Sequence, residues 1–183
     1  GRIIINGKEY KIKDLSGHNG DKKSEPAEQE KNSGTDIKGL LPLDKYRGIE
    51  IHALLGKFKF VGAQEKNLAY KCRSEVAVKN FLTELDGKLS FNFESMIDCE
   101  FTIPKARSFS LAAKSAEVEL GNLGNDFEVT LAEGSVLWNQ KQKDLYGINP
   151  QELLKLDLEW MSKSLAPYKG KIKIIERGEL QIK

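Results

Sequence analysis

The sequence has few of the residue types that build catalytic and metal centres. It contains 2 cysteines, 2 methionines, 2 tryptophans and 2 histidines in 183 residues. It has no C-x-x-C pair, no glycine-rich phosphate loop, and neither a G-x-S-x-G nor an H-E-x-x-H motif. We therefore expect no metal, no cofactor and no catalytic residue, because each such site needs several ligands or nucleophiles at a fixed spacing.

Long apolar runs and an excess of one charge are also missing. No apolar stretch approaches the roughly 18 residues of a membrane-spanning helix, so we expect no membrane span in this chain. The 29 basic and 27 acidic residues give a net charge of +2, which is too balanced for nucleic-acid binding. The sequence begins at Gly1 and shows no signal peptide, and we expect any export signal or anchor to be absent from it.

The two cysteines, Cys72 and Cys99, allow two interpretations. They can form a single structural disulfide, or they can both be free thiols in the core. Each lies in or beside a segment of alternating apolar residues, and this favours free thiols.

The N-terminal part divides into a predicted hairpin and a predicted linker. Residues 1–15 contain an apolar strand, an Asn6-Gly7 turn and an alternating return strand, which is a strong hairpin signal. Residues 16–38 are rich in Lys, Glu, Ser, Asn and Gly, so they cannot bury enough apolar surface to offset the entropy of ordering. We interpret them as a flexible linker or loop.

Residues 39–140 show the period-two alternation of half-buried β-strands, punctuated by glycines. The alternating apolar positions include Ile49 and Ile51, Phe58 and Phe60, Val76 and Val78, Phe101 and Ile103, Val118 and Leu120, and Val136 and Trp138. Asp86-Gly87 predicts a turn. Phe91, Phe109 and Phe127 recur at a spacing of 18 (109 − 91 and 127 − 109).

Two short strands in every 18 residues are what one rung of a β-solenoid needs, with the three phenylalanines stacked in one column. A meander of hairpins in a β-sandwich would also give evenly spaced strands. We favour the first alternative, a mainly β, solenoid-like stack of short strands.

Residues 141–183 are predicted to cap this stack with a C-terminal helix and a hairpin. Asn149 and Pro150 suit a helix start, and apolar residues spaced along one face favour a helix over 149–163. A strict alternation over residues 154–160 conflicts with the helix and is typical of a strand. The segment 171–182 predicts a second hairpin that turns at Arg177-Gly178.

Few residues are candidates for a binding site. Trp138 and Trp160 could dock a partner if exposed, although Trp138 at the end of a rung is expected to pack under the predicted helix. His52 lies on the polar side of a strand and His18 in the linker, so neither is expected to act as a base or metal ligand.

The carboxylates provide one enzymatic alternative. Glycosidases use two of them at a defined separation across a sugar cleft, and most of those here lie at outward strand positions or in turns. The available residues are Glu84, Asp86, Asp98, Glu100, Glu117, Glu119, Asp126, Glu128 and Glu133.

Two segments of residues 99–138, Ser115-Ala-Glu-Val118 and Glu133-Gly-Ser-Val136, are each interpreted as a turn that leads into a strand, and the stretch 48–62 has the pattern strand, glycine, strand. In these features residues 99–138 resemble the bacterial putative-adhesin domain family, whose function is unknown, and the stretch 48–62 is similar to that family's opening rung. The resemblance covers about residues 44–140 and departs from the family at Ala116, where glycine is usual. It implies a solenoid-like cell-envelope domain without catalytic residues. A weaker likeness, in Leu41-Pro-Leu-Asp44 and Asp86-Gly-Lys-Leu89, is to AsmA-type envelope proteins and would imply lipid handling.

These observations predict a non-enzymatic adhesion or assembly module, extracytoplasmic or in the cell envelope, which binds a protein, a cell-surface component or a second copy of itself. The alternatives are a polysaccharide-acting enzyme and a lipid-handling envelope protein.

Overall fold

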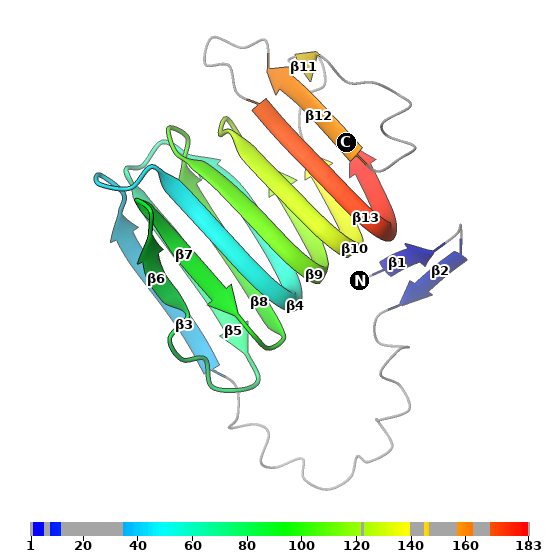
Figure 1. The fold of residues 1–183 in the computed structure, drawn as a ribbon, viewed down its shortest axis with the longest axis horizontal. Helices are drawn as coiled ribbons and strands as arrows, with labels where there is room; N and C mark the ends of the chain where they lie inside the picture. Colours follow the sequence, from blue (N-terminus) through cyan, green and yellow to red (C-terminus); the bar gives the residue numbers. More distant parts are fainter. Residues whose placement is uncertain are drawn as a thin grey trace, which may run out of the picture.

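The computed structural model shows a mainly β protein built around one mixed sheet (Figure 1). It describes residues 2–5, 8–11, 35–121, 123–139, 145–146, 157–162 and 169–182, with side chains for 35–121, 123–139 and 169–181. Within these ranges there is no helix, and so none that could cross a membrane. The mainly β prediction is confirmed.

Eleven strands form the main sheet, and two more form a separate hairpin. The separate hairpin pairs β1 (Arg2–Ile5) with β2 (Lys8–Lys11) on either side of the predicted Asn6-Gly7 turn. The strands of the main sheet are β3 (Thr35–Pro42), β4 (Gly48–Ala63), β5 (Asn67–Ser74), β6 (Leu82–Leu85), β7 (Lys88–Phe93), β8 (Ile97–Pro104), β9 (Ser108–Gly121), β10 (Phe127–Asn139), β11 (Leu145–Tyr146), β12 (Asp157–Ser162) and β13 (Lys169–Ile182).

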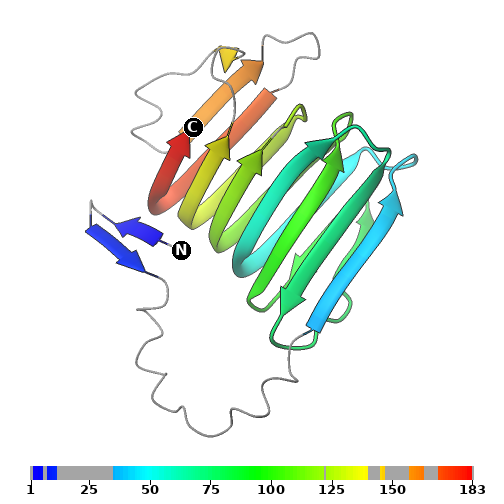
Figure 2. The same cartoon turned by 180° about the vertical axis from the view of Figure 1, so that it is seen from behind.

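The sheet folds over on itself because its longest strands bend in the middle (Figures 1 and 2). The first halves of β4, β9, β10 and β13 run parallel with β7 and form one layer. Their second halves run parallel with β8 and, together with β5 and β3, form the other layer. Period-two alternation gives every half-strand an apolar side, and the fold turns these sides toward one another.

Residues that are 18 apart in the sequence pair with each other along β9 and β10. Phe127 pairs with Phe109, and the predicted turn motifs pair as Ala116 with Gly134 and Val118 with Val136. The motifs at 115–118 and 133–136 are bends inside continuous strands and not turns between strands.

The repeat fails at Phe91, and the expected column of three phenylalanines is wrong. β4 lies between the β7–β8 strands and β9. Leu89 therefore occupies the row of Phe109, through Ile49, while Phe91 lies one row further along, opposite Ile51. Equal spacing in sequence does not produce stacking when a strand from elsewhere in the chain separates the two segments.

Stacked aromatic rings join the two layers. Phe60 lies in the second layer and Phe109 in the first, and their ring centroids are 4.6 Å apart. Phe101 stacks on Phe60 at 5.5 Å, and Phe127 stacks on Phe109 at 5.3 Å. All four side chains are buried. Ring contacts of this kind add about 0.5–1.5 kcal/mol each to the burial of apolar area, so this row fixes how the layers sit together.

Small residues line the bend. Gly56, Ala116, Gly134 and Gly178 are register partners on four neighbouring strands. A Cβ on Gly134 would overlap the carbonyl oxygen of Ala116, and one on Gly178 would overlap that of Gly134. Gly134 also has φ of +138°, a conformation that L side chains rarely adopt. The backbones approach so closely at the bend that larger side chains would not fit at Gly134 or Gly178.

A buried asparagine connects two turns at the opposite end of the strands. Asn125, which is fully buried, donates to the carbonyl oxygens of Pro104 and Arg107, each at 2.8 Å. The turn before β10 is thereby held against the turn before β9, and the buried amide has acceptors for its donors.

The C-terminal predictions need correction. Residues 157–162 form strand β12, so the helix predicted over 149–163 is wrong there, and residues 149–156 lie outside the described residues. The alternation of Leu158 and Trp160 correctly indicated a strand, and this strand, β12, pairs antiparallel with β13. The hairpin predicted over 171–182 is also wrong: β13 is one bent strand, and Gly178 serves its bend.

The structure confirms one of three smaller predictions and corrects the other two. The Asp86-Gly87 turn is confirmed, with positive φ at both residues, between the paired strands β6 and β7. Val76 and Val78 lie in an irregular segment and not in a strand. β3 begins at Thr35, inside the segment predicted as a linker, and the rest of that segment lies outside the described residues.

Gly134→Ala tests the bend. We expect it to lower the free energy of unfolding by roughly 2–4 kcal/mol, through overlap with Ala116 and through backbone strain. Gly121→Ala is the matched control, because a Cβ there meets nothing within 4 Å; it should change stability by less than about 1 kcal/mol. Urea denaturation measures the free energy of unfolding of both variants. Equal values for Gly134→Ala and Gly121→Ala would contradict the need for glycine at the bend.

Candidate functional site

The outer face of the second layer carries charged doublets whose sign alternates from strand to strand. Each doublet is two like charges on either side of one inward residue. From the sheet edge inward the doublets are Lys71 and Arg73 on β5, Asp98 and Glu100 on β8, Lys57 and Lys59 on β4, and Glu117 and Glu119 on β9. The inward residues between them are buried: Cys72, Cys99, Phe58 and Val118.

The register places opposite charges directly across each strand boundary. One row runs through Arg73, Asp98, Lys57 and Glu117. A second row runs through Lys71, Glu100, Lys59 and Glu119. Six pairs of facing residues are thus of opposite sign, two at each of three boundaries, and each such cross-strand pair contributes about 0.2–1 kcal/mol.

One ion pair is formed directly within these rows, and a second extends the first row from β5 to β3. The Lys57 Nζ atom lies 3.6 Å from the Glu117 Oε2 atom, and the Glu117 side chain is only 18% exposed. At the sheet edge, Arg73 donates to the Asp36 carboxylate at 3.0 Å, and both of these side chains are well exposed. The face is therefore more enclosed at Glu117 than at the Arg73–Asp36 pair.

A groove of about 810 Å³ follows this face. Five cations and five carboxylates line it, and uncharged side chains close its β10 end. The charged residues are Lys38, Lys57, Lys59, Lys71 and Arg73 together with Asp36, Asp98, Glu100, Glu117 and Glu119, and the residues at the β10 end are Ser135 and Leu137. Charges of both signs at fixed spacing can form salt bridges with a partner that carries charges of both signs.

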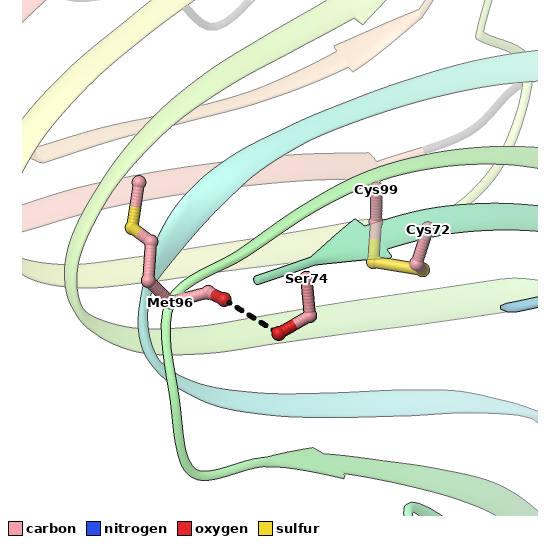
Figure 3. The surroundings of a disulfide bond; sticks show 4 residues. All are labelled: Cys72, Ser74, Met96 and Cys99. Atoms are coloured by element: carbon pink, nitrogen blue, oxygen red, sulfur yellow. Dashed lines mark hydrogen bonds between the residues drawn. A yellow bond between two sulfur atoms is a disulfide. The ribbon is translucent and has the colours of Figure 1, made fainter. Parts of the chain in front are cut away.

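A disulfide joins β5 and β8 on the inner side of the strands that carry the groove's charges, and Figure 3 shows the surroundings of this bond. Cys72 and Cys99 are register partners on β5 and β8 and are bonded to each other, with both side chains buried. Beside them, the Ser74 hydroxyl donates to the Met96 carbonyl oxygen at 3.3 Å. Our preference for free thiols is wrong, because the register brings the two cysteines face to face. The bond fixes the two strands that carry four of the groove's charges.

Among the side chains that the structure describes, Trp138 and His52 do not come together in a site. Trp138 has no exposed surface and lies in register with Leu120 on β9, so it packs in the core. Trp160 lies on β12 opposite Gly170, and its side chain is outside the described part. His52 is exposed on the first layer, 3.7 Å from Glu50, and His18 is outside the described residues.

The candidate carboxylates are spread over both layers and the turns. Asp98, Glu100, Glu117 and Glu119 line the groove. The others lie elsewhere, and several have partners of their own. The Glu84 carboxylate accepts a hydrogen bond from Tyr46, which is the main reason that the pKa of Tyr46 is raised. Among the described residues, no group of three or more potential ligands could hold a metal ion.

A second hollow of about 400 Å³ lies at the bend. Leu54, Leu55 and Met96 line it, and each side chain is about two-fifths exposed, between 39% and 45%. This surface is smaller and more apolar than the charged groove, and it meets the groove at Lys57 and Glu117.

Sequence reasoning did not identify the charged groove. The doublets are visible in the sequence as Lys-Cys-Arg, Asp-Cys-Glu, Lys-Phe-Lys and Glu-Val-Glu. Their arrangement depends on the strand order, which alternation alone does not give.

The chain has a distant structural similarity to a putative cell adhesion protein from Clostridium sporogenes. The two share 8% sequence identity with a TM-score of 0.41, over 81% of this chain and 93% of that chain. No protein-family model matches the sequence, and no curated protein matches it. Membership of the putative-adhesin domain family is therefore not shown, and a likeness this distant assigns no function.

Replacing both cysteines tests the disulfide. We expect Cys72→Ala/Cys99→Ala to lose about 2–4 kcal/mol of unfolding free energy, because the bond closes a loop with a sequence separation of 27. Ser74→Ala, a neighbouring buried change that removes two long hydrogen bonds, one to the Met96 carbonyl oxygen and one from the Val76 N–H, should cost less, about 1–2 kcal/mol. Thermal denaturation compares the variants. Two titratable thiols in the native protein would contradict the bond.

Proposed function

We propose that this chain is a non-enzymatic adhesion or assembly module that binds a protein or cell-surface component through the charged groove. The observation that carries the proposal is the alternation of charged doublets across β5, β8, β4 and β9. Rows of both signs are suited to a partner that itself carries fixed charges of both signs. Such complementarity fixes register and specificity more than it adds affinity.

The groove is built on a rigid base, and this supports a binding role. Residues that alternate with the groove's charges are buried in the core, and the disulfide joins two of its strands. Because strands hold side chains more precisely than loops do, the spacing of the charges is kept without a partner. A preformed surface of this kind loses little entropy on binding.

The disulfide also supports a place outside the cytoplasm, in keeping with a cell-envelope role. Structural disulfides persist in oxidising compartments and are rare where thiols are kept reduced. The Cys72–Cys99 bond is buried and joins two strands of the core layer, as expected of a structural disulfide and not of an exposed redox centre.

The parallel bent strands support a solenoid-like reading of the fold. β9 and β10 repeat each other residue for residue, and a short turn that contains Asn125 connects them. The rung formed by β4 is inserted out of chain order, so the repeat is not a simple continuous coil.

The enzymatic alternative has weaker support. The four candidate carboxylates in the groove face lysine or arginine residues across strand boundaries, and Glu117 is in an ion pair with Lys57. A glycosidase places two carboxyl groups at a defined separation across a sugar cleft, whereas each carboxylate here lies between cations of the neighbouring strands or beside one of them. The lipid-handling alternative would require an apolar cavity, and the space between the layers is filled by stacked aromatic rings.

Charge reversal in the groove tests the proposal. Biolayer interferometry would measure binding of the chain to defined surfaces: peptidoglycan, polygalacturonate, heparin, fibrinogen and collagen. We expect at least one surface to bind, and Lys57→Glu/Lys59→Glu to weaken that binding by about tenfold or more, since two cations at the groove centre become acids.

The matched control is Lys171→Glu/Lys173→Glu, which makes the same change in charge on the other layer. It should alter the affinity by less than about twofold, and added salt should weaken binding of the unmodified chain. Failure of every surface to bind, or equal loss in both variants, would contradict the proposal. Release of reducing ends from peptidoglycan, polygalacturonate or heparin would favour the enzymatic alternative.

A further inference from the structure

β3 ends the sheet, and its outer edge has no strand partner within the part of the chain that the structure describes. The strand spans Thr35–Pro42 and pairs on one side with β5 (Figure 2). An eight-residue edge presents a row of backbone donors and acceptors that another strand can extend.

The side chains of β3 differ between its two faces. Asp36 and Lys38 are exposed on the groove face. Asp36 pairs with Arg73 and continues the first row, whereas Lys38 faces Lys71, a like charge that leaves Lys38 without an acid across the β3–β5 boundary. Ile37 lies on the inner face, packs against the core and is half-buried at the edge. A strand added here would cover the rest of Ile37 and would meet one acid and one base on the outer face.

A second copy of β3 meets these requirements when it pairs antiparallel about Ile37. Residues directly opposite in an antiparallel pair share a face, and a two-fold axis at Ile37 places Asp36 opposite Lys38 twice. An axis at Lys38 would place two lysines opposite each other. An axis at Gly39 would bring Pro42, which has no backbone N–H, into the pairing opposite Asp36.

We infer that two copies of this chain associate edge to edge through β3, antiparallel about Ile37. The inference rests on the assembly part of the proposed function. A two-fold axis perpendicular to the sheet keeps both charged faces on the same side, so the two grooves join into one surface. The contact between five residues of each strand is small, and the dimer is correspondingly weak, with a dissociation constant roughly in the micromolar to millimolar range.

Sedimentation velocity over roughly 10 µM to 1 mM protein tests this association. We expect a monomer–dimer equilibrium that salt weakens. Asp36→Lys places lysine opposite Lys38 of the second copy, and Lys38→Asp places aspartate opposite Asp36. Each variant alone should dimerise roughly tenfold or more weakly, because two attractive pairs become repulsive.

Mixing the two variants identifies the register. The Asp36→Lys copy carries lysine at both positions and the Lys38→Asp copy carries aspartate at both, so each cross-strand pair becomes attractive again and a heterodimer should form. Glu65→Lys is the matched control, since it makes the same charge change in the exposed turn between β4 and β5. It should leave dimerisation within about twofold, and far-UV circular dichroism should confirm that each variant is folded.

A monomer at every concentration would overturn the inference, as would dimerisation that Asp36→Lys leaves unchanged or a mixture that does not recover association. These outcomes are separate from failure of the proposed function. A chain that dimerises but binds none of the tested surfaces would support this inference and contradict the proposed function. The groove variant Lys57→Glu/Lys59→Glu leaves β3 intact, so it separates the two.

Discussion

The order of the strands in the second layer is constrained by charge on one face and by apolar packing on the other. Along the sheet the doublets are cationic on β5, acidic on β8, cationic on β4 and acidic on β9. The simple chain order would give a hairpin of β4 with β5, placing Lys59 near Lys71, and would stack β9 directly on β8, placing acids beside acids. Facing like charges are destabilising by amounts similar to the gain from opposite charges. The observed order replaces these contacts with six facing pairs of opposite sign and keeps one facing like pair, Lys38 and Lys71, at the sheet edge. This balance of charges favours the insertion of β4 and β8 out of sequence.

The same insertion determines the core. With β4 between β8 and β9, Phe60 lies between Phe101 and Phe109, and the stack continues to Phe127. The sheet can close over this stack only because small residues at the bend allow the strands to fold with their backbones in near contact. The order of the charged strands, the aromatic stack and the bend therefore depend on one another. The groove lies on the outer surface of the layer that they form.

Local features of the sequence predicted local features of the fold. Period-two alternation identified the strands around Phe58, Phe101 and Val118 because one face of each is buried. The spacing of 18 was correct for β9 and β10, which are neighbours in both chain and space. The failures are non-local. Residues 154–160 fit both a helix and a strand, and pairing of β12 with β13 decided between them. Phe91 and the groove could not be placed, because nothing in an alternating pattern specifies which strand lies next to which.

Contacts between phenylalanine rings test the central claim most directly. Nuclear Overhauser effects between ring protons report separations below roughly 5 Å, and Phe→Leu variants would assign each ring. The insertion of β4 predicts cross-peaks from Phe60 to both Phe101 and Phe109, whose centroids lie 5.5 Å and 4.6 Å from that of Phe60. Direct cross-peaks between Phe91 and Phe109, with none from Phe60 to Phe109, would show that the strands stack in chain order and would contradict the account.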